Sequence, residues 1–369
     1  MKKSLKVGLS MVGVAAILSA GAVAMAAGMG GGGMGGGGMG GGGFTSEEHL
    51  GRMLYFDKNL SSPPGQACAA CHLPQAGFAD PDQELPVSEG VIAGRFGGRN
   101  SPTSGYASFS PTFTMDANTG EYVGGQFWDG RAATLKEQAK GPFLNPVEMN
   151  NTEEGVVEAV RNSHYADMFR TVYGADSLND VTTAYDLIAQ AIAAFESSKQ
   201  LNRFSSKYDA YLKKQVQLME SEANGLQLFN NNCSGCHTST SAGGAAPVFS
   251  AFTYENIGVP SNPEVIALAD LPADYVDLGL GAFVDDPAQN GKFKVPTLRN
   301  IALTAPYTHN GYFKTLKDVV HFHNTRVDAL APEYPKTVTN ATGDMGLLET
   351  DEDDIVAFLL TLTDTLPGM

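Results

Sequence analysis

One five-residue pattern occurs twice in this 369-residue chain, and it constrains the fold more than any other feature. Residues 68–72 read Cys-Ala-Ala-Cys-His and residues 233–237 read Cys-Ser-Gly-Cys-His, and together they contain all four cysteines. A Cys-x-x-Cys-His motif is typical of c-type haem attachment, in which two thioethers fix the macrocycle and the histidine binds the iron. A redox dithiol or half of a zinc site would use the same cysteines. Two copies, each with its histidine in register and no cysteine left over, favour haem.

We therefore expect two covalently bound haem c groups to carry the chemistry of the chain. His72 would be the proximal ligand of the first iron and His237 that of the second. The expected haem-binding residues of the two motifs are Cys68, Cys71, His72, Cys233, Cys236 and His237.

The first 26 residues have the pattern of a secretory signal peptide. A charged region with three lysines is followed by an apolar run over residues 7–18 and by Ala-Met-Ala at residues 24–26. A single membrane anchor is the alternative, but the apolar run is short and interrupted by glycine and serine, which favours cleavage. Because c-type haems are attached outside the cytoplasm in bacteria, we expect the protein in the periplasm or at the cell surface.

Residues 27–43 consist almost only of glycine and methionine, which predicts a flexible linker. Methionine sulfurs can bind copper, but a tract spaced by glycines has no fixed geometry for a metal. The formal net charge is −16, and loss of the three signal lysines takes it to −19. Such a surface repels nucleic acid and attracts cationic partners, for example a basic electron donor, although simple solubility explains it as well.

Helical patterns dominate the rest of the chain and strand signals are weak, so we predict a mainly α fold. The first helix is expected to begin after Thr45, because Thr45 and Glu48 have capping-box spacing. It leads into the first motif, and a helix near residues 220–230 leads into the second. This repeated order predicts two cytochrome c-like domains with long irregular loops, each with one covalent haem. We place them at residues 44–205 and 206–369.

Further helices are expected near residues 153–173, 183–199 and 315–322, and from Thr350 towards the C-terminus. The last of these could pack on either domain, including the N-terminal one. His164 is expected to be an ordinary helix residue.

Four longer segments are distinctive. They are residues 126–133 (Gln-Phe-Trp-Asp-Gly-Arg-Ala-Ala), 137–142 (Glu-Gln-Ala-Lys-Gly-Pro), 147–151 (Val-Glu-Met-Asn-Asn) and 298–307 (Leu-Arg-Asn-Ile-Ala-Leu-Thr-Ala-Pro-Tyr). Together with the two haem motifs, they closely resemble the bacterial di-haem cytochrome c peroxidase family, which includes the tryptophylquinone-forming enzyme MauG. The resemblance runs from about Gly51 to Leu362.

The resemblance implies that peroxide reacts at the N-terminal haem and that the C-terminal haem relays electrons. Trp128 matches the family's tryptophan between the haems, where an indole would shorten the electron path; an ordinary core aromatic is the alternative. Glu148 matches the distal glutamate, a general acid/base that moves a proton from the inner to the outer peroxide oxygen. Gln138 and Pro142 match its neighbours in that pocket.

The resemblance also implies a calcium ion between the domains. Asn100 matches the asparagine that binds it through the side chain, and Thr304 and Pro306 match residues that bind it through their carbonyls. Oxygen ligands completed by waters suit calcium. From composition alone, all three would be turn residues.

The chain departs from the peroxidase pattern beside the first haem. Peroxidases that need reductive activation carry a capping histidine in the loop after the first motif, whereas no histidine occurs here between His72 and His164. Residues 73–80 instead resemble the MauG-like branch, which lacks this cap. We expect the first iron to be five-coordinate or water-bound and to meet peroxide without prior reduction. Met115 is the remaining soft ligand in the loop.

A second departure concerns the second haem. The family's peroxidases use a methionine as its distal ligand and MauG-like proteins use a tyrosine, but His323 occupies this position. Bis-histidine ligation would give a low-spin iron at a lower potential than His/Met ligation. His321 would point about 200° away from His323 on a helix and is expected at the surface.

These features predict an enzyme, a di-haem peroxidase that reduces hydrogen peroxide to water. Its electrons would come from a small cytochrome c or cupredoxin through the C-terminal haem. The alternative is a MauG-like enzyme that oxidises tyrosine or tryptophan of a partner protein through a high-valent di-haem state. A plain electron-transfer cytochrome is the third interpretation and would leave Glu148 without a role. Dimers are common in the peroxidase branch, so the resemblance also implies a homodimer.

Overall fold

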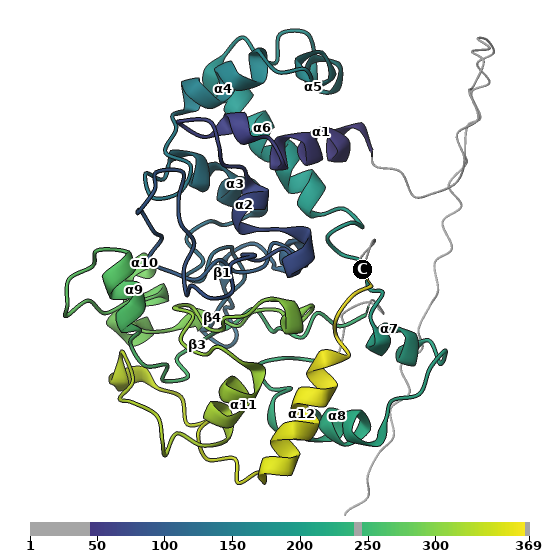
Figure 1. The fold of residues 1–369 in the computed structure, drawn as a ribbon, viewed down its shortest axis with the longest axis vertical. Coiled ribbons are helices and arrows are strands. Elements are labelled where there is room, and N and C mark those ends of the chain that lie inside the picture. Colours follow the sequence, from purple (N-terminus) through teal and green to yellow (C-terminus); the bar gives the residue numbers. More distant parts are fainter. Residues whose placement is uncertain (1–44, 240–245, 366–369) are drawn as a thin grey trace, which may run out of the picture. The chain divides into compact units, whose positions relative to one another are not determined.

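The computed structural model describes residues 45–239 and 246–365 (Figure 1). The proposed signal peptide and the Gly/Met linker lie outside the described residues. Within the described part the chain is mainly helical, with four strands of two residues each, which confirms the predicted fold class. None of the described helices combines the length and apolar character that a membrane crossing needs.

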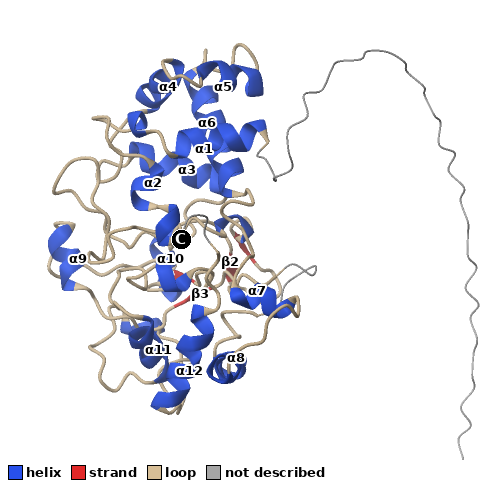
Figure 2. Cartoon of the chain, turned by 45° about the vertical axis from the view of Figure 1, so that its right-hand side comes forward, coloured by secondary structure: helices blue, strands red, loops and turns tan. Residues whose placement is uncertain are grey.

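Helices of the N-terminal half surround the first motif and those of the C-terminal half surround the second (Figures 1 and 2). The first group is α1 (Ser46–Tyr55), α2 (Cys68–Cys71), α3 (Leu135–Leu144), α4 (Glu153–Arg161), α5 (Ala166–Tyr173) and α6 (Val181–Glu196). The second group is α7 (Lys207–Leu212), α8 (Glu220–Asn232), α9 (Pro263–Leu268), α10 (Leu280–Val284), α11 (Leu316–Asn324) and α12 (Glu349–Leu360). The strands are β1 (Thr114–Met115), β2 (Tyr122–Val123), β3 (Tyr254–Glu255) and β4 (Phe293–Lys294).

The predicted start of the first helix is confirmed. Thr45 Oγ1 accepts a hydrogen bond from Glu48 N at 3.2 Å, and Glu48 Oε2 accepts one from Thr45 N at 2.7 Å. This capping box satisfies two backbone donors that the helix itself leaves unpaired. The same device, made by Thr315 and Asp318, begins α11, the helix that carries His323.

The segment predicted as one helix over residues 153–173 is divided, and that prediction was wrong. α4 ends before Asn162, and α5 follows after a turn that contains His164. Asn162 Nδ2 donates to Glu158 O at 3.0 Å, and Ser163 Oγ donates to a helix carbonyl at 2.8 Å. These side chains satisfy the last carbonyls of α4, so the helix ladder can end there.

Each half has its own apolar core, and both cores are built on the same kind of helix crossing. An added Cβ at Gly51 of α1 would lie 1.8 Å from Ala191 O of α6, and one at Gly225 of α8 would lie 1.8 Å from Asp354 O of α12. Both crossings therefore require glycine, because the backbones touch. The last helix thus packs on α8 in the C-terminal half (Figure 1).

The C-terminal core also contains a buried ion pair. Arg299 Nη1 lies 2.7 Å from Asp209 Oδ2, and Nη2 donates to Oδ1 at 3.0 Å. The two side chains are 0% and 1% exposed. Such bidentate geometry compensates the cost of removing both charges from water.

Irregular segments and the short strands join the two halves. β1 pairs with β2 and β3 with β4, both antiparallel, and a bridge between Val123 and Thr253 connects the two small sheets. The loop after the first motif also reaches the C-terminal half, where Gln83 Nε2 donates to Leu303 O at 2.8 Å and Asn100 N donates to His309 O at 2.8 Å. The loop that carries Trp128 lies in this junction.

Candidate functional site

The first Cys-x-x-Cys-His motif forms the short helix α2 and ends at His72. The Nδ1–H of His72 donates to the carbonyl of Phe78 at 3.2 Å. Because a carbonyl can only accept, this bond fixes the tautomer and leaves Nε2 free to bind a metal. Phe78 holds a φ of +64°, a left-handed conformation that is costly for a bulky residue and that presents its carbonyl to the ring.

The second motif repeats this arrangement at the end of α8. His237 Nδ1 donates to Phe249 O at 2.9 Å, and Phe249 has a φ of +56°. Burial lowers the pKa of His237 to about 4 and also lowers that of His72, so both rings are neutral at physiological pH. Neutral imidazole is the form that binds iron.

The cysteine thiols fit thioether formation better than thiolate chemistry. Burial raises the pKa of Cys71 and of Cys233 to about 12, and it raises the pKa of Cys68 and Cys236 as well. Disulfide exchange needs the thiolate, which such surroundings disfavour. This observation weakens the dithiol alternative.

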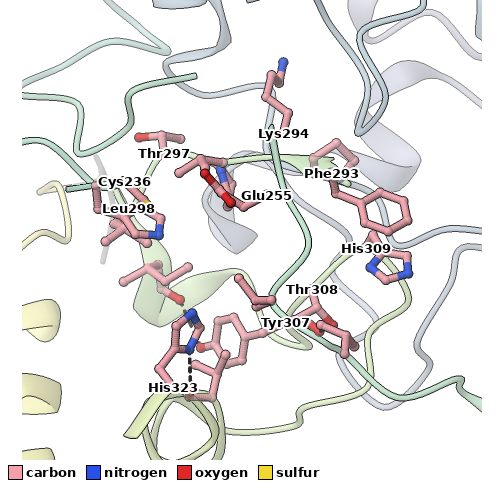
Figure 3. A pocket seen from close by; sticks show the side chains of 18 of the residues that line it. Cys236, Glu255, Phe293, Lys294, Thr297, Leu298, Tyr307, Thr308, His309 and His323 are labelled. Carbon is pink, nitrogen blue, oxygen red and sulfur yellow. Dashed lines mark hydrogen bonds between the residues drawn. The ribbon is translucent and has the colours of Figure 1, made fainter. Parts of the chain in front are cut away.

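A cavity of about 350 Å³ opens beside the second motif (Figure 3). His237 lines it together with His323 of α11. His323 Nδ1 donates to Val319 O, one helical turn earlier, at 2.7 Å, so its Nε2 is also free. His321 is 47% exposed and bonds to Glu352, as expected of a surface residue.

This cavity fits a haem. Two neutral imidazoles with free Nε2 atoms share it with both cysteines of the motif, and most of its remaining lining is apolar, including Leu298, Val320 and Leu359. Cys233 and Cys236 would hold the group covalently, and His237 and His323 would bind its iron.

Near the first motif, the main chain brings a carboxylate close to the cysteines. Gln66 Nε2 donates to Cys71 Sγ at 3.5 Å and to Glu89 O at 3.0 Å, and two residues later Val91 N donates to Glu148 O at 2.8 Å. Glu148 is half-buried, and Asn145 Nδ2 donates to its Oε1 at 2.7 Å. Burial raises the pKa of Glu148 above its ordinary value, although the bond from Asn145 opposes this. A carboxyl of this kind keeps its proton to a higher pH than a solvated one and can serve as a general acid/base.

The predicted neighbours of Glu148 lie on α3. Gln138 and Pro142 are four residues apart and so share one face of the helix, and both are half-buried. Pro142 O accepts from Met149 N at 3.2 Å, which folds the chain around Glu148 back onto the end of α3. Among the described residues that line the cavity of the second motif, none of these three predicted residues appears.

Trp128 lies where the two halves meet and lines that cavity. Its Nε1–H donates to Asn100 O at 2.8 Å, and its own carbonyl accepts from Lys294 N at 2.8 Å. Main-chain contacts from both halves therefore hold the indole in place.

The three residues predicted to bind calcium line the same cavity. Asn100 Nδ2 donates to Pro86 O at 3.1 Å, so Oδ1 is the atom of this side chain that suits a cation. Within the described part of the chain, no group of three or more His, Cys, Asp or Glu side chains could hold a metal ion. A site built from Asn100, Thr304 and Pro306 would use amide and carbonyl oxygens instead.

Met115, the alternative ligand for the first iron, is 51% exposed on the edge of the β1–β2 hairpin. Residues 73–163 are all described and contain no histidine, as the printed sequence shows. Met149, beside Glu148, packs in the apolar core of the N-terminal half. These positions leave the first motif without an evident second axial ligand from this segment.

The junction also contains side-chain contacts that no sequence motif predicted. Arg99 bridges the two halves, because it binds Asp129 Oδ2 and Asp277 Oδ2 at 2.6 Å each. His309 stacks on Phe293 with ring centroids 3.6 Å apart (Figure 3). Contacts between residues far apart in the chain leave no local sequence pattern. Asp129 itself lies in the distinctive segment of residues 126–133.

Comparison with protein families gives two matches. Residues 45–217 match the family model described as di-haem cytochrome c peroxidase, and residues 222–363 match the model described as cytochrome c. Together they include both haem motifs.

Individual relatives agree with these matches. The chain is 41% identical over 340 residues to the methylamine utilization protein MauG of Paracoccus denitrificans, which covers 85% of this chain and 88% of that protein. It is 32% identical to the cytochrome c551 peroxidase of Pseudomonas aeruginosa, over 87% of this chain and 80% of that protein. The crystal structure of the dihaem peroxidase BthA of Burkholderia thailandensis superposes with a TM-score of 0.78 at 32% identity, covering 86% of each chain.

Proposed function

Since the chain belongs to the di-haem cytochrome c peroxidase family, which includes MauG, and is an oxidoreductase that carries two haem c groups, we propose that it reduces hydrogen peroxide to water. The observation that carries this proposal is the half-buried carboxyl of Glu148 near the first motif, with a raised pKa. An electron-transfer cytochrome has no use for such a group.

When bound, the two haems supply the iron that reacts with peroxide and the path for electrons. Cys68, Cys71 and His72 would hold the first. Glu148 would accept a proton from the inner oxygen of peroxide and return it to the outer oxygen, which makes water the leaving group. Gln138 and Pro142 would shape the space beside it and orient the peroxide.

We further propose that peroxide reaches the first site without prior reduction of the protein. The absence of histidine from residues 73–163 and the exposed position of Met115 support this proposal. His237 and His323 would keep the second site closed to peroxide, because both imidazoles would bind its iron. Trp128 would carry electrons between the sites.

The electrons would come from a small cytochrome c or cupredoxin. The formal charge of −16 favours a cationic donor, because opposite charges speed association. A calcium ion held by Asn100, Thr304 and Pro306 would fix the junction between the halves. We place the protein in the periplasm or at the cell surface, with residues 1–26 as its signal peptide and residues 44–205 and 206–369 as its domains.

Oxidation of a partner protein, as in MauG, is the second candidate. The identity of 41% to MauG of Paracoccus denitrificans favours it, and so does the open first site. His323 speaks against it, because the resemblance to MauG-like proteins implies a tyrosine at this position.

Steady-state peroxide consumption by the protein as isolated tests the proposal. With reduced cytochrome c as donor, we expect turnover without a lag and the same rate after pre-reduction of the enzyme. A strict need for pre-reduction would contradict the open site. Peroxide consumption that no small donor supports, but that a tyrosine- or tryptophan-containing partner protein does, would move the conclusion to the second candidate.

A further inference from the structure

Lys294 is a cation inside the junction that the proposed reaction does not use. It ends strand β4 and lines the cavity of the second motif. Its side chain runs away from His323 (Figure 3), and its Nζ donates to the main-chain carbonyl of Gly125 at 2.5 Å. It makes no ion pair with any residue that the structure describes, so its ammonium has only a carbonyl as partner.

Asp129 is the acid that affects the pKa of Lys294, and two arginines already bind its carboxylate. Arg99 Nη1 binds Asp129 Oδ2 at 2.6 Å, and Arg131 Nη1 binds Oδ1 at 2.9 Å. Asp277 adds one more carboxylate, also bound by Arg99. These five residues carry three positive and two negative charges when Lys294 is protonated. The positive charge of Lys294 is therefore not matched by an acid of its own.

Lys294 is bonded to the loop that carries Trp128 at two points. Its backbone N–H donates to Trp128 O at 2.8 Å, and its Nζ binds Gly125, which has a φ of +71°. The loop is closed by a bond from Gln126 N to Ala132 O at 2.7 Å. A change at Lys294 thus acts directly on the surroundings of the indole.

The indole of Trp128 cannot pass on its ring proton. Its Nε1–H donates to the main-chain carbonyl of Asn100, and a carbonyl is not a base. If the indole loses one electron, it keeps this proton and becomes a cation. The ammonium of Lys294, which is bonded to Gly125 in the same loop, raises the energy of that cation, and the low polarity of the protein interior strengthens the effect.

We propose that Lys294 regulates electron transfer through Trp128, because its ammonium form disfavours and its amine form permits transient one-electron oxidation of the indole. This inference rests on the proposed relay role of Trp128. In each cycle one electron leaves the indole towards the site oxidised by peroxide, and one electron from the donor side replaces it. Trp128 is regenerated, and no proton moves at Nε1.

Lys294 changes its charge near neutral pH. Burial lowers the pKa of Lys294 to about 7, although Asp129 opposes this. Tyr254, on the paired strand β3, stays neutral because burial raises its pKa, whereas burial raises the pKa of Glu255 towards the range in which Lys294 titrates. The Lys294 variants below separate the charge of Lys294 from that of Glu255. Arg99 and Arg131 do not lose their protons. As pH rises through the pKa of Lys294, the indole therefore becomes easier to oxidise.

The test follows electron transfer from the second haem in a single turnover, after the donor-reduced holoprotein is mixed with peroxide across neutral pH. In the wild type we expect the rate to rise with pH, on the order of tenfold. In Lys294→Met the rate should equal the high-pH rate of the wild type at every pH. In Lys294→Arg it should equal the low-pH rate at every pH. Lys292→Met, two residues away with its Nζ on Gln289, should behave as the wild type.

An independent readout comes from Trp128, the only tryptophan of the chain. Its ultraviolet resonance Raman bands should shift with the same midpoint as the rate, and this shift should be lost in Lys294→Arg. If Lys294→Arg keeps the wild-type pH profile, the charge does not control the relay and the inference is wrong, whatever happens to Lys294→Met.

A Trp128→Phe variant separates the inference from its premise. Loss of rapid transfer in Trp128→Phe, together with flat profiles in both Lys294 variants, supports the regulation. Unchanged transfer in Trp128→Phe removes the relay, and the inference with it, while leaving the peroxide reaction intact. A wild-type protein that does not react with peroxide would instead overturn the proposed function.

Discussion

In both halves of the molecule, the motif histidine donates its Nδ1–H to the carbonyl of a phenylalanine held at positive φ. The distance is 3.2 Å from His72 to Phe78 and 2.9 Å from His237 to Phe249. The phenylalanine follows its histidine by six residues in one half and by twelve in the other. Loops of different length therefore give the same hydrogen bond to the motif histidine. This indicates that the orientation of the imidazole constrains the structure more than the length of the loop.

The two halves differ in the second residue that we assign to each site. The N-terminal half has the carboxyl of Glu148, and the C-terminal half has the imidazole of His323. A carboxyl with a raised pKa can move protons, whereas an imidazole fixed through Nδ1 can only bind a metal through Nε2. Under the proposed function, this one residue beyond the motif would decide whether a site reacts with peroxide or relays electrons.

The largest effect is expected from Glu148→Gln. The amide keeps the shape but cannot accept a proton, so the rate of reaction with peroxide should fall by about 10²–10⁴-fold. In the wild type this rate should also decline as pH falls through the raised pKa of Glu148, and the variant should lack this decline. Stopped-flow absorbance measures both. Glu154→Gln, an exposed carboxylate of α4, is the matched control, and an unchanged rate in Glu148→Gln would remove the reactive half of the comparison.

Asp209→Asn should lower the stability of the C-terminal half and leave that of the N-terminal half unchanged. Removing one partner of a buried pair leaves Arg299 uncompensated, and we expect a loss of about 3 kcal/mol in the free energy of unfolding of the C-terminal half. Urea unfolding followed at each haem would detect it, and an equal loss in both halves would contradict the separation of the cores.

The pH dependence of this pair has a definite sign. Burial alone would raise the pKa of Asp209, but Arg299 outweighs it and the pKa is lowered. The stabilisation is therefore present above the ordinary carboxyl pKa and is lost as pH falls through the lowered value. Asp209→Asn should lose this acid-range dependence.

His323→Met should change the relay and leave the reactive site alone. A thioether stabilises ferric iron less than imidazole does, so the potential of the second haem should rise by on the order of 0.1 V, within the range of about 0.8 V that axial ligands span. Spectroelectrochemistry measures the shift. His321→Ala should show none, because that side chain is 47% exposed. A loss of the low-spin signal in His321→Ala would mean that the ligand had been misassigned.

The smallest effect is expected from Met115→Ala. Because Met115 is 51% exposed on a strand edge, its removal should not alter the spin state of the first haem. Electron paramagnetic resonance (EPR) of the oxidised protein checks this, and a new high-spin signal would show that Met115 had been a hidden ligand.

Local patterns predicted much of this molecule. The capping box at Thr45 predicted the start of the first helix, and the two motifs predicted two haem c groups. Helical spacing separated His323, on the cavity, from His321, at the surface. Each of these features depends on residues only a few positions apart, so the sequence contains all the information.

Other features had no such signal, either because local side-chain bonds and packing override helix propensity or because the partners are distant in the chain. Pro142 lies inside α3, although proline usually ends a helix, and it was not predicted to be helical. The divided helix at Asn162 follows from side-chain bonds that compete with the helix ladder. No sequence pattern distinguished Lys294, which the fold places against the loop of Trp128. The ion pair between Arg99 and Asp277 joins residues 178 positions apart.

The most direct test of the difference between the two sites is low-temperature EPR of the oxidised holoprotein, before and after one equivalent of peroxide. We expect one high-spin ferric signal, from the first haem, that disappears on adding peroxide, and one low-spin signal from the second haem. Two low-spin signals that peroxide leaves unchanged would contradict it, because both sites would then be closed.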